Sequence, residues 1–257
     1  MEYQTIKGEK VPSLGLGTYR LTGETCRQAV ERAIGMGYRH IDTAQMYGNE
    51  AEVGRGISAS GMDRDELFVT TKIWPSDFAH DRVVGTTRES LEKLGTGSID
   101  LLLMHWPPRG GTPLGETLGA MRELQEEGVV RHIGVSNFST SLVEEASEHA
   151  EIFCNQVEYS PLRDQTAILD QAREMDYLLT AYQPLSRGSV ERDAIIREVG
   201  EAHGKTAAQV SLRWLIQQEK VSAIPKATGE DHLRANLDVF DFELSDGEME
   251  RISSLAR

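Results

Sequence analysis

Lysine, cysteine and long apolar runs are all scarce in this 257-residue sequence. The two cysteines, Cys26 and Cys154, stand far apart and lack the spacing of metal ligands. We therefore expect two buried thiols in a reducing cytoplasm rather than a disulfide. No apolar run approaches the roughly 18 residues that suggest a transmembrane helix, and the first residues lack the pattern of a secretion signal. These absences predict a cytoplasmic protein with no membrane partner.

Positive charge is also in short supply. The sequence carries 27 basic and 41 acidic residues, which gives a net charge of −14, and most of the basic residues are arginine. Binding to nucleic acid needs a basic surface that displaces counterions, so we expect no nucleic-acid partner. Abundant carboxylates with little lysine fit a halophilic protein adapted to concentrated salt, but they also fit an ordinary acidic cytosolic enzyme. The composition leaves both alternatives open.

What the sequence does contain is a regular alternation of strand-like and helix-like segments. The expected strands cover residues 13–17, 38–42, 67–72, 99–105, 132–136, 153–158, 178–183 and 222–226. Helical patterns cover residues 24–36, 81–94, 113–127, 165–175 and 206–218. Apolar strands separated by helices indicate a parallel sheet covered by helices. We predict an α/β protein, a (β/α)8 TIM barrel, with a doubly wound open sheet as the alternative.

Residues 3–11 stand before the first of these strands and carry Gly8 near their centre. This pattern predicts an N-terminal β-hairpin that turns at Lys7, Gly8 and Glu9. The chain has no linker rich in proline, glycine or serine and no abrupt change of composition. We therefore expect residues 1–257 to form a single domain.

Four ionisable residues stand at or just after the C-terminal ends of predicted strands: Asp42, Tyr47, Lys72 and His105. The C-terminal ends of parallel strands in a barrel meet at one mouth, so these side chains are expected to converge. A tyrosine there can donate a proton to a carbonyl oxygen, acting as a general acid. Lys72, held by Asp42, would lower the pKa of Tyr47. His105 would donate a hydrogen bond to the substrate or tune Tyr47.

Each of these residues has a simpler interpretation when it is taken alone. An aspartate after a strand usually caps a turn or a helix, and a lysine at a strand end usually faces solvent. Their joint position at one end of the barrel favours catalysis. His40 and Asp42 share a strand face and would allow a metal, but the other strand ends lack further ligands, so we expect no metal. The segment Gly15-Leu16-Gly17 lacks the third glycine of a dinucleotide fingerprint.

Several motifs, in order along the chain, resemble those of one enzyme family. They are Gly15-Leu16-Gly17-Thr18-Tyr19, residues 38–44 with Tyr47-Gly48-Asn49-Glu50, residues 102–107, residues 133–138, residues 155–161, residues 181–185, and Ile224-Pro225-Lys226. From Val11 to Leu255 the chain resembles the aldo-keto reductase family, and in particular its short-loop members similar to 2,5-diketo-gluconate reductases. The resemblance implies a barrel that transfers hydride from NADPH to an aldehyde or ketone. In that family pattern Tyr47 is the general acid, Lys72 and Asp42 tune it, and His105 orients the substrate.

The resemblance also implies a site for the nicotinamide cofactor. Ser136, Asn137 and Gln156 would hold the carboxamide, and Tyr182 would stack on the nicotinamide ring. The full set of implied cofactor-binding residues is Gly17, Thr18, Tyr19, Asp42, Ser136, Asn137, Gln156, Tyr182, Gln183, Pro184, Leu185, Arg187, Ile224, Pro225, Lys226, Ala227, Thr228, His232 and Asn236.

The chain departs from the family pattern where the cofactor's 2′-phosphate would lie. Ala227 stands where the family commonly has a serine, and His232 stands where it commonly has an arginine. A bidentate guanidinium contact to the phosphate is therefore lost. Arg234 could substitute, although we expect it on a solvated helix face. The resemblance thus implies NADPH as cofactor with a weakened preference, and NADH as a possible second cofactor.

The implied substrate-binding residues are Tyr19, Met46, Trp74, His105 and Trp106, which would make the mouth apolar and aromatic. Arg109 follows closely, and we expect it in solvent rather than against an acidic substrate. The segment after Ser186 is short. In this respect the chain resembles family members whose specificity loops are short. We expect small aldehydes, α-keto aldehydes or sugar-derived ketones as substrates.

Two functions stay open on the sequence alone. The complete set of four residues favours an NAD(P)H-dependent oxidoreductase that reduces aldehydes or ketones to alcohols. The alternative is a non-catalytic, cofactor-binding regulatory protein on the same barrel. Hydride transfer is reversible, so the sequence also leaves the physiological direction open. The family resemblance implies a monomer whose partner is a small carbonyl substrate.

Overall fold

The computed structural model describes residues 1–108 and 110–256, so Arg109 and the expectation attached to it lie outside the described residues. Eight parallel strands form one sheet in which each strand pairs with the next along the chain. They are β3 (Leu16–Gly17), β4 (His40–Asp42), β5 (Phe68–Ile73), β6 (Ile99–Met104), β7 (Val130–Ser136), β8 (Cys154–Glu158), β9 (Leu178–Tyr182) and β10 (Val221–Ala223). Every residue of β5 and β6 is buried, as expected for parallel strands that are covered on both faces.

The two edges of the sheet meet and close it into a barrel. Leu14, just before β3, forms a parallel bridge with Ala223 of β10. The backbone N–H of Gly15 donates to Ala223 over 2.8 Å, and that of Ala223 donates to Ser13 over 2.9 Å. Gly17 lets the edges approach near the C-terminal end, because a Cβ there would lie 2.7 Å from the Ile224 carbonyl oxygen. The predicted (β/α)8 barrel is confirmed, and the alternative of an open sheet is wrong.

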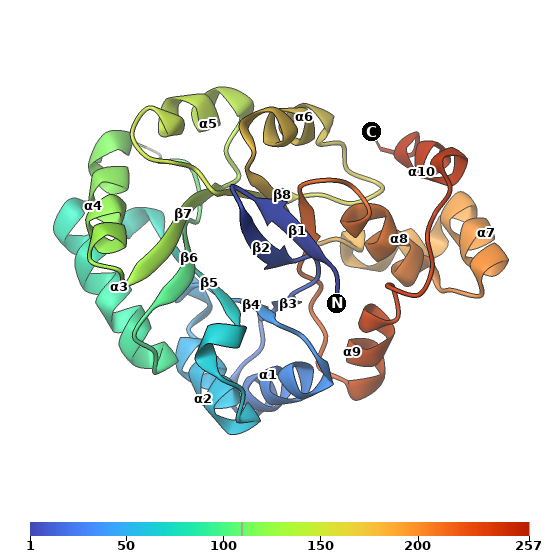
Figure 1. Ribbon diagram of the computed structural model, residues 1–257, viewed down its shortest axis with the longest axis horizontal. Coiled ribbons are helices and arrows are strands. Elements are labelled where there is room, and N and C mark those ends of the chain that lie inside the picture. The colour runs from blue at the N-terminus through green and yellow to red at the C-terminus, as the bar shows by residue number, and fades with distance from the viewer. Residues whose placement is uncertain (109, 257) are drawn as a thin grey trace.

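Helices surround the strands as an outer ring (Figure 1). They are α1 (Gly23–Met36), α2 (Glu50–Ser60), α3 (His80–Leu94), α4 (Leu114–Glu126), α5 (Thr140–Ser147), α6 (Thr166–Met175), α7 (Ala194–His203), α8 (Ala207–Ile216), α9 (Glu230–Leu237) and α10 (Asp246–Ser253). Shorter 3₁₀ segments are Gln45–Tyr47, Arg64–Glu66, Pro75–Asp77 and Ser186–Arg192. The five helical ranges expected from the sequence correspond to α1, α3, α4, α6 and α8.

The N-terminal hairpin closes one end of the barrel. Strands β1 (Tyr3–Ile6) and β2 (Glu9–Pro12) pair antiparallel, and Lys7 and Gly8 between them both have positive φ angles, of 48° and 83°. Ile6 and Val11 bury their side chains in a cluster with the barrel residues Phe68, Leu101, Leu103, Phe153, Cys154 and Leu178. In Figure 1 the hairpin lies across the barrel opening. The predicted hairpin is confirmed, and it leaves the C-terminal ends of the strands as the open mouth.

Two remaining expectations concern composition. Cys26 and Cys154 are both free and buried, as their isolation in the sequence predicts. Among residues 1–108 and 110–256, no helix combines the length and apolarity that a bilayer crossing requires.

Candidate active site

The four ionisable residues come from three neighbouring strands and one adjacent loop. Asp42 ends β4, Lys72 is the penultimate residue of β5, and His105 directly follows β6. Tyr47 ends the 3₁₀ segment after β4, and Gly48, with φ of 64°, turns the chain toward α2. Because β4, β5 and β6 are adjacent and parallel, these side chains meet at the C-terminal mouth, as the sequence predicts.

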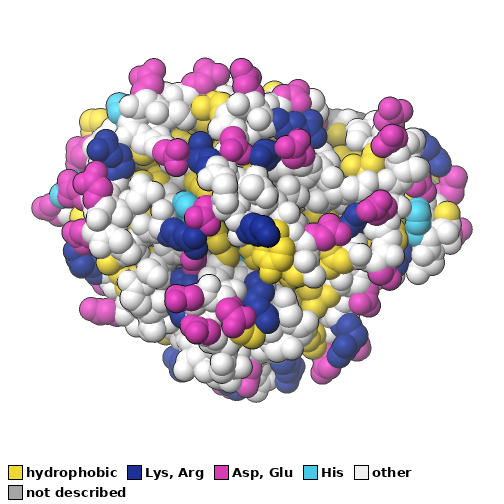
Figure 2. Space-filling model, viewed as in Figure 1, with side chains coloured by type: hydrophobic (Ala, Val, Ile, Leu, Met, Phe, Trp, Pro, Cys, Tyr) yellow, Lys and Arg dark blue, Asp and Glu magenta, His cyan; other side chains and the backbone are white. Residues whose placement is uncertain are grey.

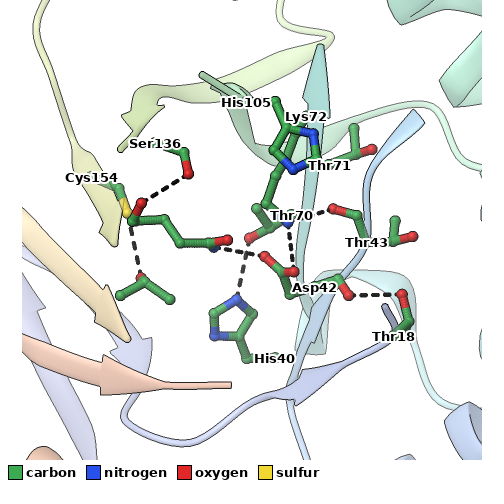
Figure 3. A network of polar contacts seen from close by, with 12 residues as sticks. Thr18, His40, Asp42, Thr43, Thr70, Thr71, Lys72, His105, Ser136 and Cys154 are labelled. Atoms are coloured by element: carbon green, nitrogen blue, oxygen red, sulfur yellow. Dashed lines mark hydrogen bonds and ion pairs between the residues drawn. The ribbon is translucent and has the colours of Figure 1, made fainter. Parts of the chain in front are cut away.

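Asp42 and Lys72 form a buried ion pair (Figure 3). The Lys72 Nζ donates to Asp42 Oδ1 over 2.6 Å and to the Thr43 carbonyl over 2.8 Å, and the Lys72 side chain is fully buried. Burial alone would lower the pKa of Lys72, but the nearby Asp42 and Tyr47 together raise it above its ordinary value. Lys72 therefore stays a cation, and the aspartate fixes where that cation lies.

Tyr47 stands beside this pair. The Lys72 Nζ lies 5.1 Å from the centre of the Tyr47 ring, and the His105 ring centre lies 5.7 Å from it. Burial of the phenol raises the pKa of Tyr47, while the Lys72 cation lowers it, and burial is the larger effect. The Lys72 cation acts in the predicted direction, but burial outweighs it, so the pKa of Tyr47 lies above its ordinary value.

His105 is held neutral by its surroundings. Burial, and then the Lys72 cation, lower the pKa of His105 to about 3. Its Nδ1 is buried and has no hydrogen-bond partner among the described residues, and the Trp74 ring lies against it with centres 5.1 Å apart. A neutral imidazole carries one N–H, so the His105 tautomer with its proton on Nε2 can donate one hydrogen bond from that atom.

Two buried residues, Asn49 and Glu50, anchor the Tyr47 loop. They belong to the motif around Tyr47, but the sequence alone indicated no role for them. The Asn49 amide donates to the carbonyls of Thr18 and Leu21, each over 2.9 Å, and accepts from the Thr43 hydroxyl over 2.7 Å. Glu50 accepts a 2.6 Å hydrogen bond from Thr71, the residue before Lys72. Only their place directly after Tyr47-Gly48 in the motif could have signalled this role.

The residues expected at the carboxamide lie at the same mouth. The Ser136 hydroxyl donates to the Gln156 carbonyl over 2.8 Å, and the Asn137 amide donates to Ser136 Oγ over 3.0 Å. The Tyr182 hydroxyl donates to Asn137 Oδ1 over 2.8 Å. Gln156 Nε2 donates to Asp42 Oδ2 over 2.8 Å, which ties this group directly to the ion pair.

The expected pyrophosphate segment leaves β9 in an unusual backbone conformation. Gln183, Ser186 and Arg187 have φ angles of 51°, 45° and 55°. Pro184 is buried, Leu185 is partly buried, and Arg187 is exposed with its Nε bonded to Gln183 Oε1 over 3.0 Å. This loop lies just beyond Tyr182, next to the carboxamide residues.

The segment after β10 contains both buried and exposed positions. Ile224, Pro225, Ala227 and Asn236 are buried, whereas Lys226, Thr228 and His232 are exposed. Arg234 is exposed and pairs with Glu230 on the same helix over 3.1 Å, as expected for a solvated face. Ala227 brings no hydroxyl to this segment, and the first turn of α9 carries the acidic residues Glu230 and Asp231.

The residues expected to bind substrate surround Tyr47 and His105. Tyr19 and Met46 are 45% and 46% exposed, and the Tyr19 and Tyr47 ring centres lie 5.1 Å apart. Trp74 and Trp106 are partly buried. The mouth is therefore apolar and aromatic around the two residues that can donate to a substrate oxygen. His40, which could have been a metal ligand by its position, is buried inside the barrel. Its Nε2 is hydrogen-bonded to the Thr70 hydroxyl over 3.2 Å.

The side chains at the mouth fit a nicotinamide cofactor. Asn137 and Gln156 place amide side chains at the mouth, where the Gln156 NH₂ is held by Asp42, and Tyr182 offers an aromatic ring bonded to Asn137. Thr18 is committed elsewhere, because its hydroxyl donates to the Asp42 carbonyl over 2.9 Å (Figure 3). Its part in binding would be to hold Asp42 in place.

The closed barrel and the chemistry at its C-terminal mouth place the chain among the barrel oxidoreductases. Comparison with known proteins makes this more specific. The model of the Aldo/keto reductase family matches residues 13–257, and the chain belongs to this family.

Individual relatives agree with this assignment. The chain is 39% identical over 251 residues to a glyoxal reductase of Bacillus subtilis (strain 168), covering 96% of this chain and 90% of that protein. It is 38% identical over 251 residues to methylglyoxal reductase DkgB of Yersinia pestis, covering 96% and 94% of the two chains. A crystal structure provisionally named as a 2,5-diketo-D-gluconic acid reductase B superposes with a TM-score of 0.97 at 45% identity, covering 100% of this chain and 92% of that one.

The chain is thus an NAD(P)H-dependent oxidoreductase that reduces the carbonyl groups of aldehydes and ketones. Nothing in these comparisons supports the alternative of a non-catalytic regulatory protein.

Proposed function

We propose that this enzyme reduces small aldehydes, α-keto aldehydes and sugar-derived ketones, with NADPH as its principal cofactor and Tyr47 as the proton donor. The observation that carries the proposal is the buried Asp42–Lys72 pair with Lys72 Nζ 5.1 Å from the centre of the Tyr47 ring. The named activities of the glyoxal and methylglyoxal reductases support the substrate class. The apolar, aromatic mouth agrees with small carbonyl compounds of varied shape.

Each residue of the mouth has a distinct part in this proposal. Tyr47 gives its phenolic proton to the carbonyl oxygen, and the Lys72 cation stabilises the phenolate that remains. Asp42 keeps Lys72 charged and oriented despite its burial. His105, neutral at physiological pH, donates a hydrogen bond to the same oxygen and so orients the substrate. A reduced nicotinamide, when bound, supplies the hydride to the carbonyl carbon.

We propose that the cofactor is held along one side of the mouth. Ser136, Asn137 and Gln156 would bind the carboxamide, and Tyr182 would cover the nicotinamide face. Residues 183–187 would pass near the pyrophosphate, and Lys226 would meet the 2′-phosphate. We propose that the remaining cofactor-binding positions implied by the family pattern line the same path.

The preference for NADPH over NADH is expected to be modest. Lys226 is exposed and belongs to no ion pair in the described part of the chain, so it can meet a phosphate. Ala227 and the exposed His232 supply neither a hydroxyl nor a guanidinium, and Glu230 and Asp231 add negative charge nearby. We propose that NADH is used as well. We also propose that residues 1–257 act as a single-domain monomer in the cytoplasm.

The test of the proton donor is the change Tyr47→Phe, which removes one oxygen and keeps the ring. We expect turnover of methylglyoxal and other small aldehydes to fall by about 10²-fold or more, because general acid catalysis typically contributes that much. We expect the affinity for NADPH, measured by the quenching of tryptophan fluorescence, to stay close to that of the wild type. Undiminished turnover in the variant would assign the proton donor elsewhere.

A further inference from the structure

Both carboxylate oxygens of Asp42 are occupied, and by different partners. Oδ1 accepts from Lys72 Nζ over 2.6 Å, and Oδ2 accepts from Gln156 Nε2 over 2.8 Å. Asp42 and Gln156 are only 2% exposed each, so both hydrogen bonds are screened from water. The two residues lie 114 positions apart in the sequence, on β4 and β8, and their side chains cross the barrel to meet.

The carboxylate decides which way the Gln156 amide faces. An ionised carboxylate only accepts hydrogen bonds, so the NH₂ of the amide must point to Asp42 and the Oε1 must point away. No hydrogen bond reaches this Oε1 from residues 1–108 or 110–256. The atom is also not fully buried. Gln156 therefore presents an unpaired acceptor at the mouth while its donor end is committed to Asp42.

The backbone of Gln156 is equally well held. Its carbonyl accepts from the Ser136 hydroxyl over 2.8 Å and from the Asn137 backbone N–H over 3.0 Å. Ser136 ends β7, the strand next to β8, and Asn137 directly follows it. Hydrogen bonds thus hold both the backbone and the side-chain amide of Gln156. A residue held in this way can fix the position of another side chain.

We propose that Gln156 is a positioning residue for proton transfer: it holds Asp42, and through Asp42 the Lys72 cation, while its Oε1 accepts from an amide N–H of the bound cofactor. The proposal deepens the proposed function and rests on it. The cofactor's carboxamide and the proton-donating group would then be joined by a continuous chain, from the ligand N–H through Gln156 and Asp42 to Lys72 and Tyr47.

The expected consequence concerns the proton affinity of Tyr47. The ionisable groups that act on or face Tyr47 are Lys72 from β5, Asp42 from β4, His105 after β6, Tyr19 after β3 and Tyr182 from β9. Of these, the Lys72 cation is the one that lowers the pKa of Tyr47. If Gln156 no longer solvates Asp42, the aspartate draws the Lys72 proton more strongly, and the phenolate loses part of its stabilisation.

The first experiment measures the link without any cofactor. Gln156→Met removes both polar atoms and keeps the length, and Asp42→Asn removes the charge. We expect the shift in urea midpoint of the double variant to be smaller than the sum of the two single shifts, because both changes break one shared hydrogen bond. The control pair Tyr182→Phe with Asp42→Asn should be additive, since the Tyr182 hydroxyl contacts Asn137 and not Asp42. Additive shifts for Gln156→Met and Asp42→Asn would overturn the proposal.

The second experiment follows kcat against pH at saturating cofactor. We expect Gln156→Met to lower kcat by about tenfold or more, as for a lost hydrogen bond to a charged group, and to move the alkaline limb to higher pH. Gln156→Glu should recover kcat as the pH falls, because a proton shared between two carboxyls restores a donor to Asp42. Tyr182→Phe should raise the KM for cofactor and leave the alkaline limb in place.

The outcomes separate this proposal from the proposed function. Turnover by the wild type that is lost in Tyr47→Phe supports the proposed function, whatever Gln156 does. With that result in hand, a raised cofactor KM in both Gln156 variants with a wild-type pH profile would show that Gln156 only binds the ligand. No turnover by the wild type with any carbonyl substrate would instead count against the proposed function, and the double-variant cycle would still test the Gln156–Asp42 link.

Discussion

At the scale of single residues, the site depends on where each functional side chain stands along its strand. Asp42, Lys72 and His105 each stand where an apolar run stops, and the βα alternation decides that all three ends meet. The balance of effects on the Tyr47 pKa could not be predicted, because burial of the phenol depends on Tyr19, His105 and other side chains that pack from distant segments. The Gln156–Asp42 hydrogen bond could not be predicted either, because it joins residues 114 positions apart.

The cofactor tail gives a prediction at this scale. We expect the double change Ala227→Ser and His232→Arg to raise the ratio of kcat/KM for NADPH over that for NADH by about tenfold or more. A hydroxyl and a guanidinium would add charge-assisted hydrogen bonds to the 2′-phosphate, which NADH lacks. The measurement is initial-rate kinetics with both cofactors and one aldehyde.

The matched control for that experiment is Arg234→Lys on the same helix. Arg234 is exposed and pairs with Glu230 over 3.1 Å, so its replacement should leave the cofactor ratio close to that of the wild type. A strong preference of the wild type for NADH, or a ratio unmoved by the double change, would refute the proposed binding path for the phosphate.

At the scale of elements, the strands and the helices α1, α3, α4, α6 and α8 could be predicted, whereas α2, α5, α7, α9 and α10 could not. Helix α2 carries Gly54 and Gly56, which lower helix propensity, and α5 has only eight residues. Their helical state depends on packing against neighbours that periodicity does not show.

Gly56 shows how such packing works and supplies a second prediction. A Cβ at Gly56 would lie 2.6 Å from the Arg27 carbonyl oxygen and 2.7 Å from the Val30 Cβ, so α1 and α2 touch through the missing side chain. We expect Gly56→Ala to reduce the free energy of unfolding by about 1–3 kcal/mol, as overpacking usually does. The measurement is urea denaturation followed by circular dichroism.

Gly85 in α3 is the control for that change. It is also a helical glycine, but a Cβ there meets nothing within 4 Å. We expect Gly85→Ala to increase the free energy of unfolding by about 0.5–1 kcal/mol, because alanine loses less backbone entropy than glycine in a helix. Equal effects of the two changes would mean that the α1–α2 contact is not what requires Gly56.

The whole molecule was predictable as a barrel because the count and spacing of apolar runs fix it, whereas its charge had no single interpretation. The sheet closes between residues that stand at opposite ends of the sequence, Leu14 and Ala223, and no local pattern announces that contact. The surface that results is strongly acidic overall, although on the face in Figure 2 acidic and basic side chains are interspersed. Exposed pairs such as Arg88 with Glu127 contribute about 0–1 kcal/mol each.

Salt should therefore act on this molecule chiefly through its net charge. Screening shortens the reach of charge from about 10 Å at 0.1 M salt to about 3 Å at 1 M, which weakens the ion pairs but weakens long-range repulsion more. With a net charge of −14, we expect the thermal midpoint at neutral pH to rise by a few degrees between low and molar KCl. Near the isoelectric point, pI ≈ 5.0, the repulsion disappears and the same salt should leave the midpoint unchanged or lower it. An equal rise at both pH values would trace the effect to strengthened apolar burial rather than to charge. Failure to fold without added salt would mark the protein as adapted to concentrated salt, and full activity without salt would make it an ordinary acidic enzyme.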